Sequence, residues 1–127
     1  VLVVTSTPNE SVSSLISETL LGEVSVFSVC TSRLTLTQRL AACVSVVNVT
    51  SSYWWDGNIE HGIEQTLFIK TRSAHITAVM QTIKSSHPYE VPEIVTIPLS
   101  HVDRGYSAWM HSVLKPAATK QRTKSAV

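Results

Sequence analysis

Glycine is scarce in this chain, with four glycines among 127 residues. Nucleotide-binding loops need closely spaced glycines so that the backbone can approach a phosphate, and the sequence holds no such run. Two cysteines, Cys30 and Cys43, are too few for a disulfide framework or a four-cysteine zinc site. No apolar run reaches the roughly 18 residues that a membrane-spanning helix requires. These shortages argue against nucleotide-dependent enzymes, disulfide-rich modules and membrane-spanning proteins.

Charge is nearly balanced overall but unevenly placed. The formal net charge is +1, yet residues 115–127 hold four basic residues and no acidic one, so the remainder is acidic. An acidic body lacks the basic face that nucleic-acid recognition needs, and we expect no nucleic-acid partner. Residues 115–127 are polar with little to bury, which predicts a disordered basic tail.

The chain opens on an apolar segment, Val1–Thr5, without an initiator methionine. We therefore expect it to be part of a longer protein, in which a targeting segment would lie outside the given sequence. A cytoplasmic location is favoured, and no membrane span is expected within this chain.

Hydrophobic periodicity predicts seven elements in the order β-α-β-β-α-β-α. Asp56-Gly57 is a strong hairpin signal, because glycine accepts the positive φ that tight hairpin turns need. On the strand after this turn, alternation places Ile63, Leu67 and Ile69 on one face. The predicted strands are residues 1–5, 42–49 with extended chain to 55, 59–72 and 93–98.

Three amphipathic helices separate and follow these strands, with Asn9, Ser73 and Asp103 as candidate N-caps. Pro88 and Pro116 end the second and third helices, since the residue before a proline is pushed out of helical geometry. The first six elements fit a split β-α-β arrangement, an α+β fold with an antiparallel sheet and two helices on one face. The other face needs cover, which another copy of the chain would supply.

Five stretches lie in a fixed order on this frame. Together they resemble the CutA family, which is named for divalent-cation tolerance. The resemblance covers residues 1–21 and 37–114, and it implies a homotrimer of ferredoxin-like subunits whose strands pair across subunits. The stretches are RLAACVSVV at 39–47, SSYWWDGNIE at 51–60, EQTLFIKTR at 64–72, HPYEVPEIVTIPL at 87–99 and YSAWM at 106–110.

Residues 22–36, GEVSVFSVCTSRLTL, depart from the family pattern, in which the first helix leads almost directly into the LAAC strand. Gly22 is a good helix stop, so a loop or a short surface flap is one interpretation. A gene-prediction artefact such as retained intron sequence is the other. Without these residues, Leu21 would run into Thr37 as one helix. We predict a domain at 1–114 with a dispensable insertion at 22–36.

Copper binding follows from the resemblance alone. It implies ligands at a cysteine ending the first strand and at two adjacent histidines before Pro-Tyr, and the matching positions here hold Thr5, Ser86 and His87. A transition-metal ion takes three or four protein ligands, so His87 remains the single candidate. We expect at most weak binding of Cu²⁺ or another divalent cation.

A cleft between subunits is the predicted location of the polar and aromatic residues around His87. Such a group could perform acid–base chemistry, but a polar network that satisfies interface groups is the favoured interpretation. The chain has no nucleophile elbow and no cofactor fingerprint, which predicts a protein that is not an enzyme. The candidate cleft residues are Trp55, Glu64, Lys70, Tyr89 and Glu93.

The resemblance thus predicts a non-enzymatic homotrimer implicated in divalent-cation, and specifically copper, tolerance. One alternative is a trimeric scaffold for protein partners, because vertebrate relatives are linked to the anchoring of acetylcholinesterase. Another is a small-ligand sensor, because the trimeric architecture is similar to that of PII-type signalling proteins.

Overall fold

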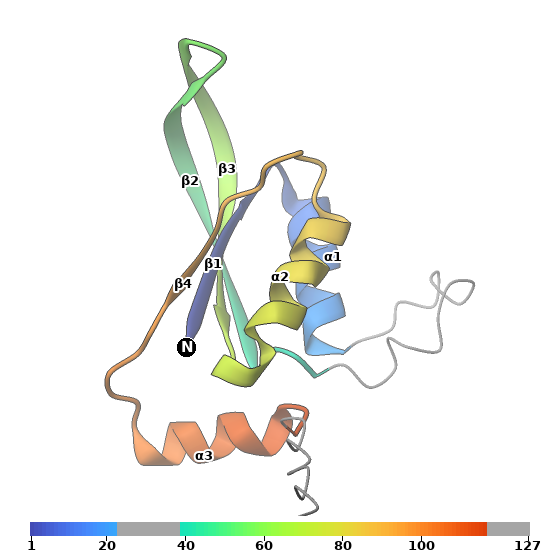
Figure 1. Ribbon diagram of the computed structural model, residues 1–127, viewed down its shortest axis with the longest axis vertical. Helices are drawn as coiled ribbons and strands as arrows, with labels where there is room; N and C mark the ends of the chain where they lie inside the picture. The colour runs from blue at the N-terminus through green and yellow to red at the C-terminus, as the bar shows by residue number, and fades with distance from the viewer. Residues whose placement is uncertain (23–38, 117–127) are drawn as a thin grey trace, which may run out of the picture.

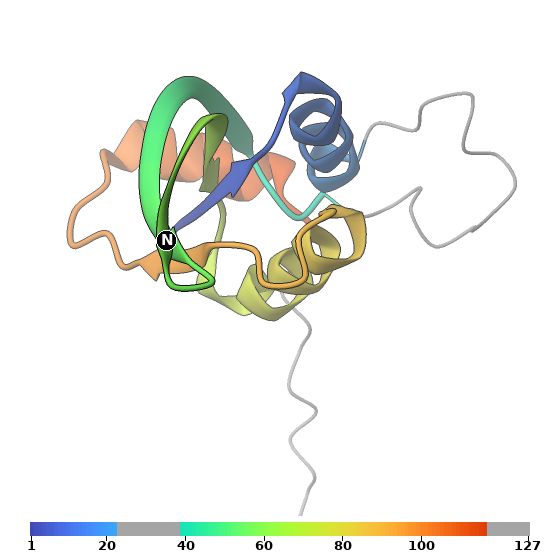
Figure 2. The ribbon, with the colours of Figure 1, turned by 90° about the horizontal axis from the view of Figure 1, so that it is seen from above.

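The computed structural model describes residues 1–22 and 39–116. The chain forms a four-stranded antiparallel sheet in the order β2-β3-β1-β4, with α1 and α2 on one face and α3 across one end (Figures 1 and 2). This confirms the predicted α+β arrangement and its element order. The elements are β1 (Leu2–Thr7), α1 (Glu10–Leu21), β2 (Cys43–Trp55), β3 (Asn58–Lys70), α2 (Ile76–Ser86), β4 (Ile94–Ile97) and α3 (Arg104–Val113).

Two of the three predicted helix caps are present. The Asn9 side chain accepts from the Val12 N–H at 3.1 Å, and the Asp103 carboxylate accepts from the Tyr106 N–H at 3.0 Å. The prediction for Ser73 is wrong, because Ser73 begins a short 3₁₀ turn, Ser73–His75, that leads into α2 without a side-chain cap. A 3₁₀ turn satisfies part of the first helical N–H groups through its own tighter bonds.

The β2–β3 hairpin is the longest element and projects beyond the rest of the sheet (Figure 1). Its turn has positive φ at both central residues, 49° at Asp56 and 77° at Gly57, as a two-residue hairpin requires. β1 pairs with β3 only from Gln65 to Lys70, so the outer half of the hairpin has no third strand among the described residues. Ile63 lies on the predicted face, yet it is 81% exposed because the helices end before reaching it.

The hydrophobic core lies between the sheet and the two helices on its covered face. β1 and β3 contribute Val3, Leu67 and Ile69, all fully buried. The helices meet them with side chains at helical spacing, which places one apolar stripe of each helix against the sheet. These helical residues are Ile16 and Leu20 on α1 and Val79 and Ile83 on α2.

The two described segments on either side of residues 23–38 meet at the end of α1. Gly22 ends this helix with φ of 87°, and the N–H groups of Leu40 and Ala41 both donate to the Leu20 carbonyl, at 2.9 and 3.0 Å. Arg39 and Leu40 lie outside any helix. Apart from Gly22, the predicted insertion at 22–36 lies outside the described residues, as does most of the predicted tail.

The second face of the sheet is only partly covered by the described residues. α3 packs at one end of it, where Met110 and Leu114 bury against Ala42. Val47, Val95 and Ile97 point to this face and remain nearly half exposed. Within residues 1–22 and 39–116, no helix is both long enough and apolar enough to cross a membrane.

Candidate functional site

A cleft of about 730 Å³ opens between the β2–β3 hairpin and the loop that follows α2; we call it the hairpin cleft. Its walls combine aromatic rings with carboxylates, and its floor carries serines. The lining residues are Ser6, Ser51, Ser52, Tyr53, Trp55, Glu64, Pro88, Tyr89, Glu90, Val91 and Glu93.

The alternation of side chains along β2 and β3 determines which hairpin residues face this cleft. Tyr53 and Trp55 on β2 and Glu64 on β3 all project from the sheet face turned away from α1 and α2. Between Tyr53 and Glu64, Ser51 pairs with Gly62. A Cβ added at Gly62 would meet no atom within 4 Å. These two small residues therefore leave the space that the larger side chains surround.

His87 anchors the opposite wall. It is 8% exposed, its Nε2 bonds the Ser6 carbonyl at 2.6 Å, and its Nδ1 accepts from the Tyr89 N–H at 3.1 Å. Since a carbonyl only accepts and an N–H only donates, the ring carries its proton on Nε2 in this arrangement. Both nitrogens are thus engaged within the protein. A metal ion at His87 would have to replace one of these bonds.

Ser6 also fixes the far end of the same loop. Its hydroxyl donates to a Glu93 carboxylate oxygen at 2.7 Å and lies 3.3 Å from the Thr66 hydroxyl. One residue of β1 therefore holds the loop at both His87 and Glu93. This arrangement keeps Tyr89 and Glu93 at the edge of the cleft.

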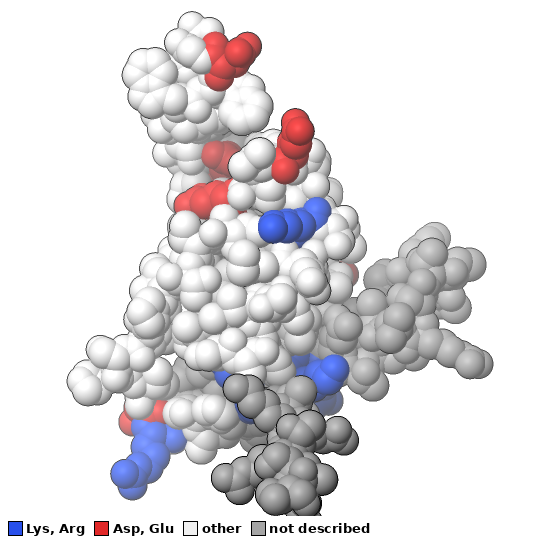
Figure 3. Space-filling model, viewed as in Figure 1, with Lys and Arg blue, Asp and Glu red and all other residues white. Residues whose placement is uncertain are grey.

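Glu64 is the most enclosed acid of the cleft, with 9% of its surface exposed. Its carboxylate oxygens are absent from the buried side-chain atoms that lack a hydrogen-bond partner among the described residues, so they stay open to solvent in the cleft. None of the residues lining the cleft is basic. On the face drawn in Figure 3, acidic side chains gather on and just below the hairpin, while basic ones lie mainly toward the α3 end. The lining of the cleft is therefore acidic, without a basic residue.

The acidity of the Tyr89 phenol is affected by this environment. Its pKa is raised above 10.0, chiefly because burial disfavours the phenolate, and further by the negative charge of Glu64 and by Tyr53. Tyr89 thus keeps its proton and can donate a hydrogen bond at any physiological pH.

The cleft predicted from the sequence lies between subunits and stays a prediction. Of the five residues predicted for it, Trp55, Glu64, Tyr89 and Glu93 line the hairpin cleft of the single chain. Lys70 does not, because it lies six residues beyond Glu64 along β3, where its ammonium stacks 5.6 Å from the centre of the Tyr106 ring. Ser6 and Tyr53 were not among the residues predicted for the cleft, although Tyr53 shares the parity of Trp55 and could have been placed by it.

A preformed metal centre is absent from the described part of the chain, which holds no group of three or more His, Cys, Asp or Glu side chains suited to an ion. Thr5, at the position where the resemblance implies a cysteine ligand, is fully buried with its hydroxyl unpartnered. The carboxylates of the hairpin cleft remain the oxygen donors that a cation could reach.

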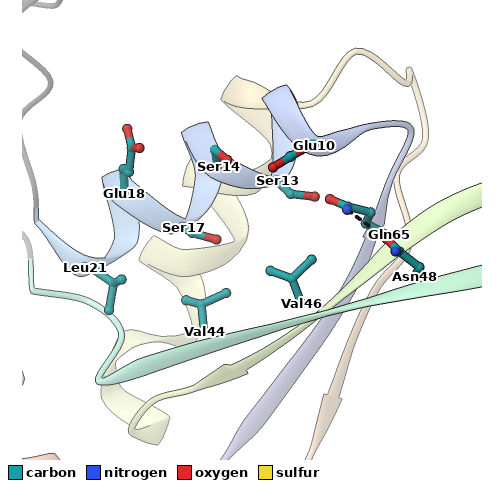
Figure 4. A pocket seen from close by; sticks show the side chains of 10 residues that line it. All are labelled: Glu10, Ser13, Ser14, Ser17, Glu18, Leu21, Val44, Val46, Asn48 and Gln65. Carbon is teal, nitrogen blue, oxygen red and sulfur yellow. Dashed lines mark hydrogen bonds between the residues drawn. The ribbon is translucent and has the colours of Figure 1, made fainter.

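A second hollow of about 440 Å³ lies between α1 and β2; we call it the serine groove (Figure 4). Ser17 on α1 and the valines Val44 and Val46 on β2 face one another across it, and the Gln65 amide donates to Asn48 at 2.9 Å beside it. Among the described residues, the Ser17 hydroxyl and the Gln65 side-chain amide oxygen have no hydrogen-bond partner. The groove lies where α1 passes above the edge strand β2.

Comparison with known proteins gives a consistent result. The sequence model of the CutA1 divalent ion tolerance protein family matches residues 30–113, so the match begins inside the predicted insertion. The divalent-cation tolerance protein CutA from Escherichia coli is 36% identical over 81 residues, which cover 63% of this chain and 72% of that protein.

Solved structures agree over a greater length. A CutA1 variant from Pyrococcus horikoshii superimposes with a TM-score of 0.76 at 30% identity, covering 91% of this chain and 98% of that one. The Thermus thermophilus protein gives 0.74 at 31% identity, with 90% and 97% covered. A relative from Archaeoglobus fulgidus, described as periplasmic, gives 0.76 at 25% identity, with 90% and 97% covered. Because the family model matches most of the chain and the fold and motifs agree with it, the chain belongs to the CutA1 family of divalent ion tolerance proteins.

Proposed function

We propose that this chain is a non-enzymatic, homotrimeric cation-binding protein of divalent-cation tolerance, and that the hairpin cleft is where the cation binds. The observation that carries the proposal is the cleft lining, which holds the carboxylates of Glu64, Glu90 and Glu93 and no basic residue. Carboxylates gathered without a basic neighbour attract a cation through their combined negative charge.

The donor chemistry points to weak, reversible binding. Glu64 and Glu93 supply oxygen ligands, and the remaining coordination positions fall to water, since fewer than three protein ligands converge in the described residues. Cu²⁺ is the ion implied by the resemblance, and it also prefers imidazole. His87 can serve it only by releasing the Tyr89 N–H or the Ser6 carbonyl.

Calorimetric titration of Cu²⁺ into the native protein tests this function. Glu64→Gln keeps the shape of the side chain and removes its charge, and we expect it to weaken binding by about tenfold, equivalent to about 1.4 kcal/mol. Glu60→Gln is the matched control, because Glu60 lies on the same strand and the same face but outside the cleft lining.

His87→Asn separates the two candidate ligand types. If Cu²⁺ binding persists in this variant and falls in Glu64→Gln, the carboxylates hold the ion. If His87→Asn folds and loses the ion while Glu64→Gln keeps it, His87 is the ligand and the cleft is not the site. Absence of Cu²⁺ binding to the native protein would reject the metal function altogether.

A further inference from the structure

The serine groove contains two buried polar atoms that no described residue satisfies. They are the Ser17 hydroxyl on α1 and the side-chain amide oxygen of Gln65 on β3. Gln65 uses its amide nitrogen on Asn48, at 2.9 Å, and its oxygen is left without a donor among the described residues. A buried polar atom without a partner costs free energy, so both atoms favour a molecule that bonds to them.

Ser17 departs from the pattern of other helical hydroxyls in this chain. Thr82 and Ser85 on α2 each donate to the carbonyl four residues earlier, at 3.0 and 2.8 Å, which is the usual bond of a hydroxyl within a helix. Ser17 makes no such bond in the described structure and faces Val44 and Val46 across the groove (Figure 4). Because its hydroxyl has no bond to break, rotation about the Cα–Cβ bond can bring it to a ligand.

The rest of the lining favours a cation with a long apolar body. Val44 and Val46 supply apolar surface, and none of the described residues that line the groove is basic. Glu10 and Glu18 lie at its rim, eight residues apart on α1, which separates them by about 12 Å along the helix axis. The Glu18 carboxylate is directed away from the sheet, so it can meet a charge at the mouth of the groove (Figure 4).

The groove lies on the sheet face that carries α1 and α2. The apolar surfaces that need another copy are the opposite face and the outer half of the hairpin. A strand added to the open edge of β2 would lie about 4.8 Å away in the plane of the sheet. Such a strand would extend the floor of the groove and leave the space between α1 and β2.

From these observations we infer that the serine groove binds a linear aliphatic polyamine. An inner ammonium group donates to Ser17 and to the amide oxygen of Gln65, the methylene chain lies over the valines of β2, and the terminal ammonium groups reach the carboxylates of the rim. The volume of about 440 Å³ is within the range of small-molecule sites. The site is separate from the hairpin cleft, because no residue lines both.

Calorimetric titration of the native assembly with spermidine tests this inference, with 1,8-octanediol as a neutral molecule of the same chain length. We expect spermidine to bind saturably and the diol to bind at least tenfold more weakly, because the acidic rim attracts only the charged chain. NMR locates the site, since the side-chain amide signals of Gln65 should move as spermidine is added.

Matched variants identify the contacts. Ser17→Ala should weaken spermidine binding by about three- to tenfold, the range of one hydrogen bond, and alanine suits the helix, so the fold is retained. Ser85→Ala is its control, because it removes a helical hydroxyl outside the groove. Glu18→Gln should weaken binding by about two- to fivefold, the range of an exposed ion pair, and Glu60→Gln should not, because Glu60 does not line the groove.

Ser17→Leu fills the groove with an apolar side chain and should abolish spermidine binding, while circular dichroism shows the fold unchanged. Equal binding of 1,8-octanediol, equal losses in Ser17→Ala and Ser85→Ala, or no binding of spermidine to the native assembly would overturn the inference. Spermidine binding that survives in Ser17→Leu and is lost in Glu64→Gln would also overturn it, because the polyamine would then lie in the hairpin cleft.

Discussion

Ser6 connects strand β1 to the loop that forms one wall of the hairpin cleft. Its backbone carbonyl accepts a hydrogen bond from Nε2 of His87, and its hydroxyl donates one to the Glu93 carboxylate. Both ends of the loop are therefore bonded to a single residue. The His87 ring then orients Tyr89 by accepting its N–H, and the two rings lie 4.7 Å apart. At this scale His87 acts as a buried connector whose hydrogen bonds set the position of the Tyr89 ring.

The ionisation of Tyr89 gives a direct test of the cleft's electrostatics. Its pKa is raised by burial first and by Glu64 and Tyr53 second, so the folded protein holds the phenolic proton more tightly than the unfolded chain does. This contribution to stability is complete below about pH 10 and is lost as the pH rises through the folded-state pKa. Ultraviolet titration of the native protein minus that of Tyr89→Phe should show a phenol ionising above 10.0.

Glu64→Gln should move this difference titration toward lower pH, because it removes one of the charges that disfavour the phenolate. The shift should be partial, since burial is the larger cause. A Tyr89 phenol that ionises in the ordinary range, or one that Glu64→Gln leaves unchanged, would mean that the carboxylate does not face the ring.

The connection from α1 to β2 is the feature that matters most at the scale of elements. The Leu20 carbonyl accepts from both Leu40 and Ala41, so the chain returns to the point that it left at Gly22. We propose that residues 22–36 form an insertion that the fold of residues 1–114 does not need, since the described bonds from Leu40 and Ala41 to Leu20 hold the start of the next segment against the end of α1.

Deleting residues 22–36 should leave the fold intact and raise the free energy of unfolding. The remaining link of Thr37, Gln38 and Arg39 would join Leu21 to Leu40 as a short loop, and closing a shorter loop should lower the entropy cost by about 1 to 2 kcal/mol. Urea denaturation followed by circular dichroism measures the change. A variant that aggregates, or unfolds at lower urea, would show that the segment is an integral part of the fold.

At the scale of the whole molecule, several apolar surfaces are left without cover by the described chain. The outer half of the hairpin has no third strand, and isolated two-stranded ribbons are at best marginally stable. Ile63 and Trp54 near its end are 81% and 73% exposed. The outer edge of the thirteen-residue β2 also has no strand beside it in the described sheet, although long open edges promote association.

We therefore predict an obligate oligomer, in which the hairpin of one copy packs against the sheet of another; the family resemblance implies three copies. Light scattering of the native protein should give three times the mass of the chain. Ile63→Lys should dissociate the assembly or lower its thermal stability, because it would place a charge in the interface.

Thr77→Lys is the matched control, since it adds the same charge on the exposed face of α2, away from the hairpin. A native protein of single-chain mass, or equal effects of the two substitutions, would contradict an interface at the hairpin. Because unfolding of an obligate oligomer includes dissociation, the midpoint of thermal unfolding should also rise with protein concentration.

Local signals predicted the elements well because each one depends on neighbouring residues. Asp56-Gly57 determined the turn through its backbone conformation, and Asn9, Gly22 and Asp103 determined helix ends through bonds within three or four residues. Ser73 is not a helix cap, because the chain passes from the extended Arg72 into a 3₁₀ turn at Ser73–His75 before α2 begins. Ile63 lies on the same sheet face as Leu67 and Ile69, as its position in the strand predicted, but it is exposed because the helices do not extend over it.

The sequence by itself determined the order of the elements, the family and most of the cleft residues, since strand parity and short motifs are encoded locally. Only the tertiary structure decided which chemistry those residues share. It placed Lys70 beside Tyr106 at the far end of β3, engaged both nitrogens of His87 in hydrogen bonds, and brought Glu64 into one cleft with Tyr53, Trp55 and Tyr89. These outcomes depend on register between strands and on contacts between residues far apart in sequence, such as those of Ser6 with His87, 81 residues away, and with Glu93, 87 residues away. No local pattern can specify such contacts, because they arise only when the whole sheet has formed.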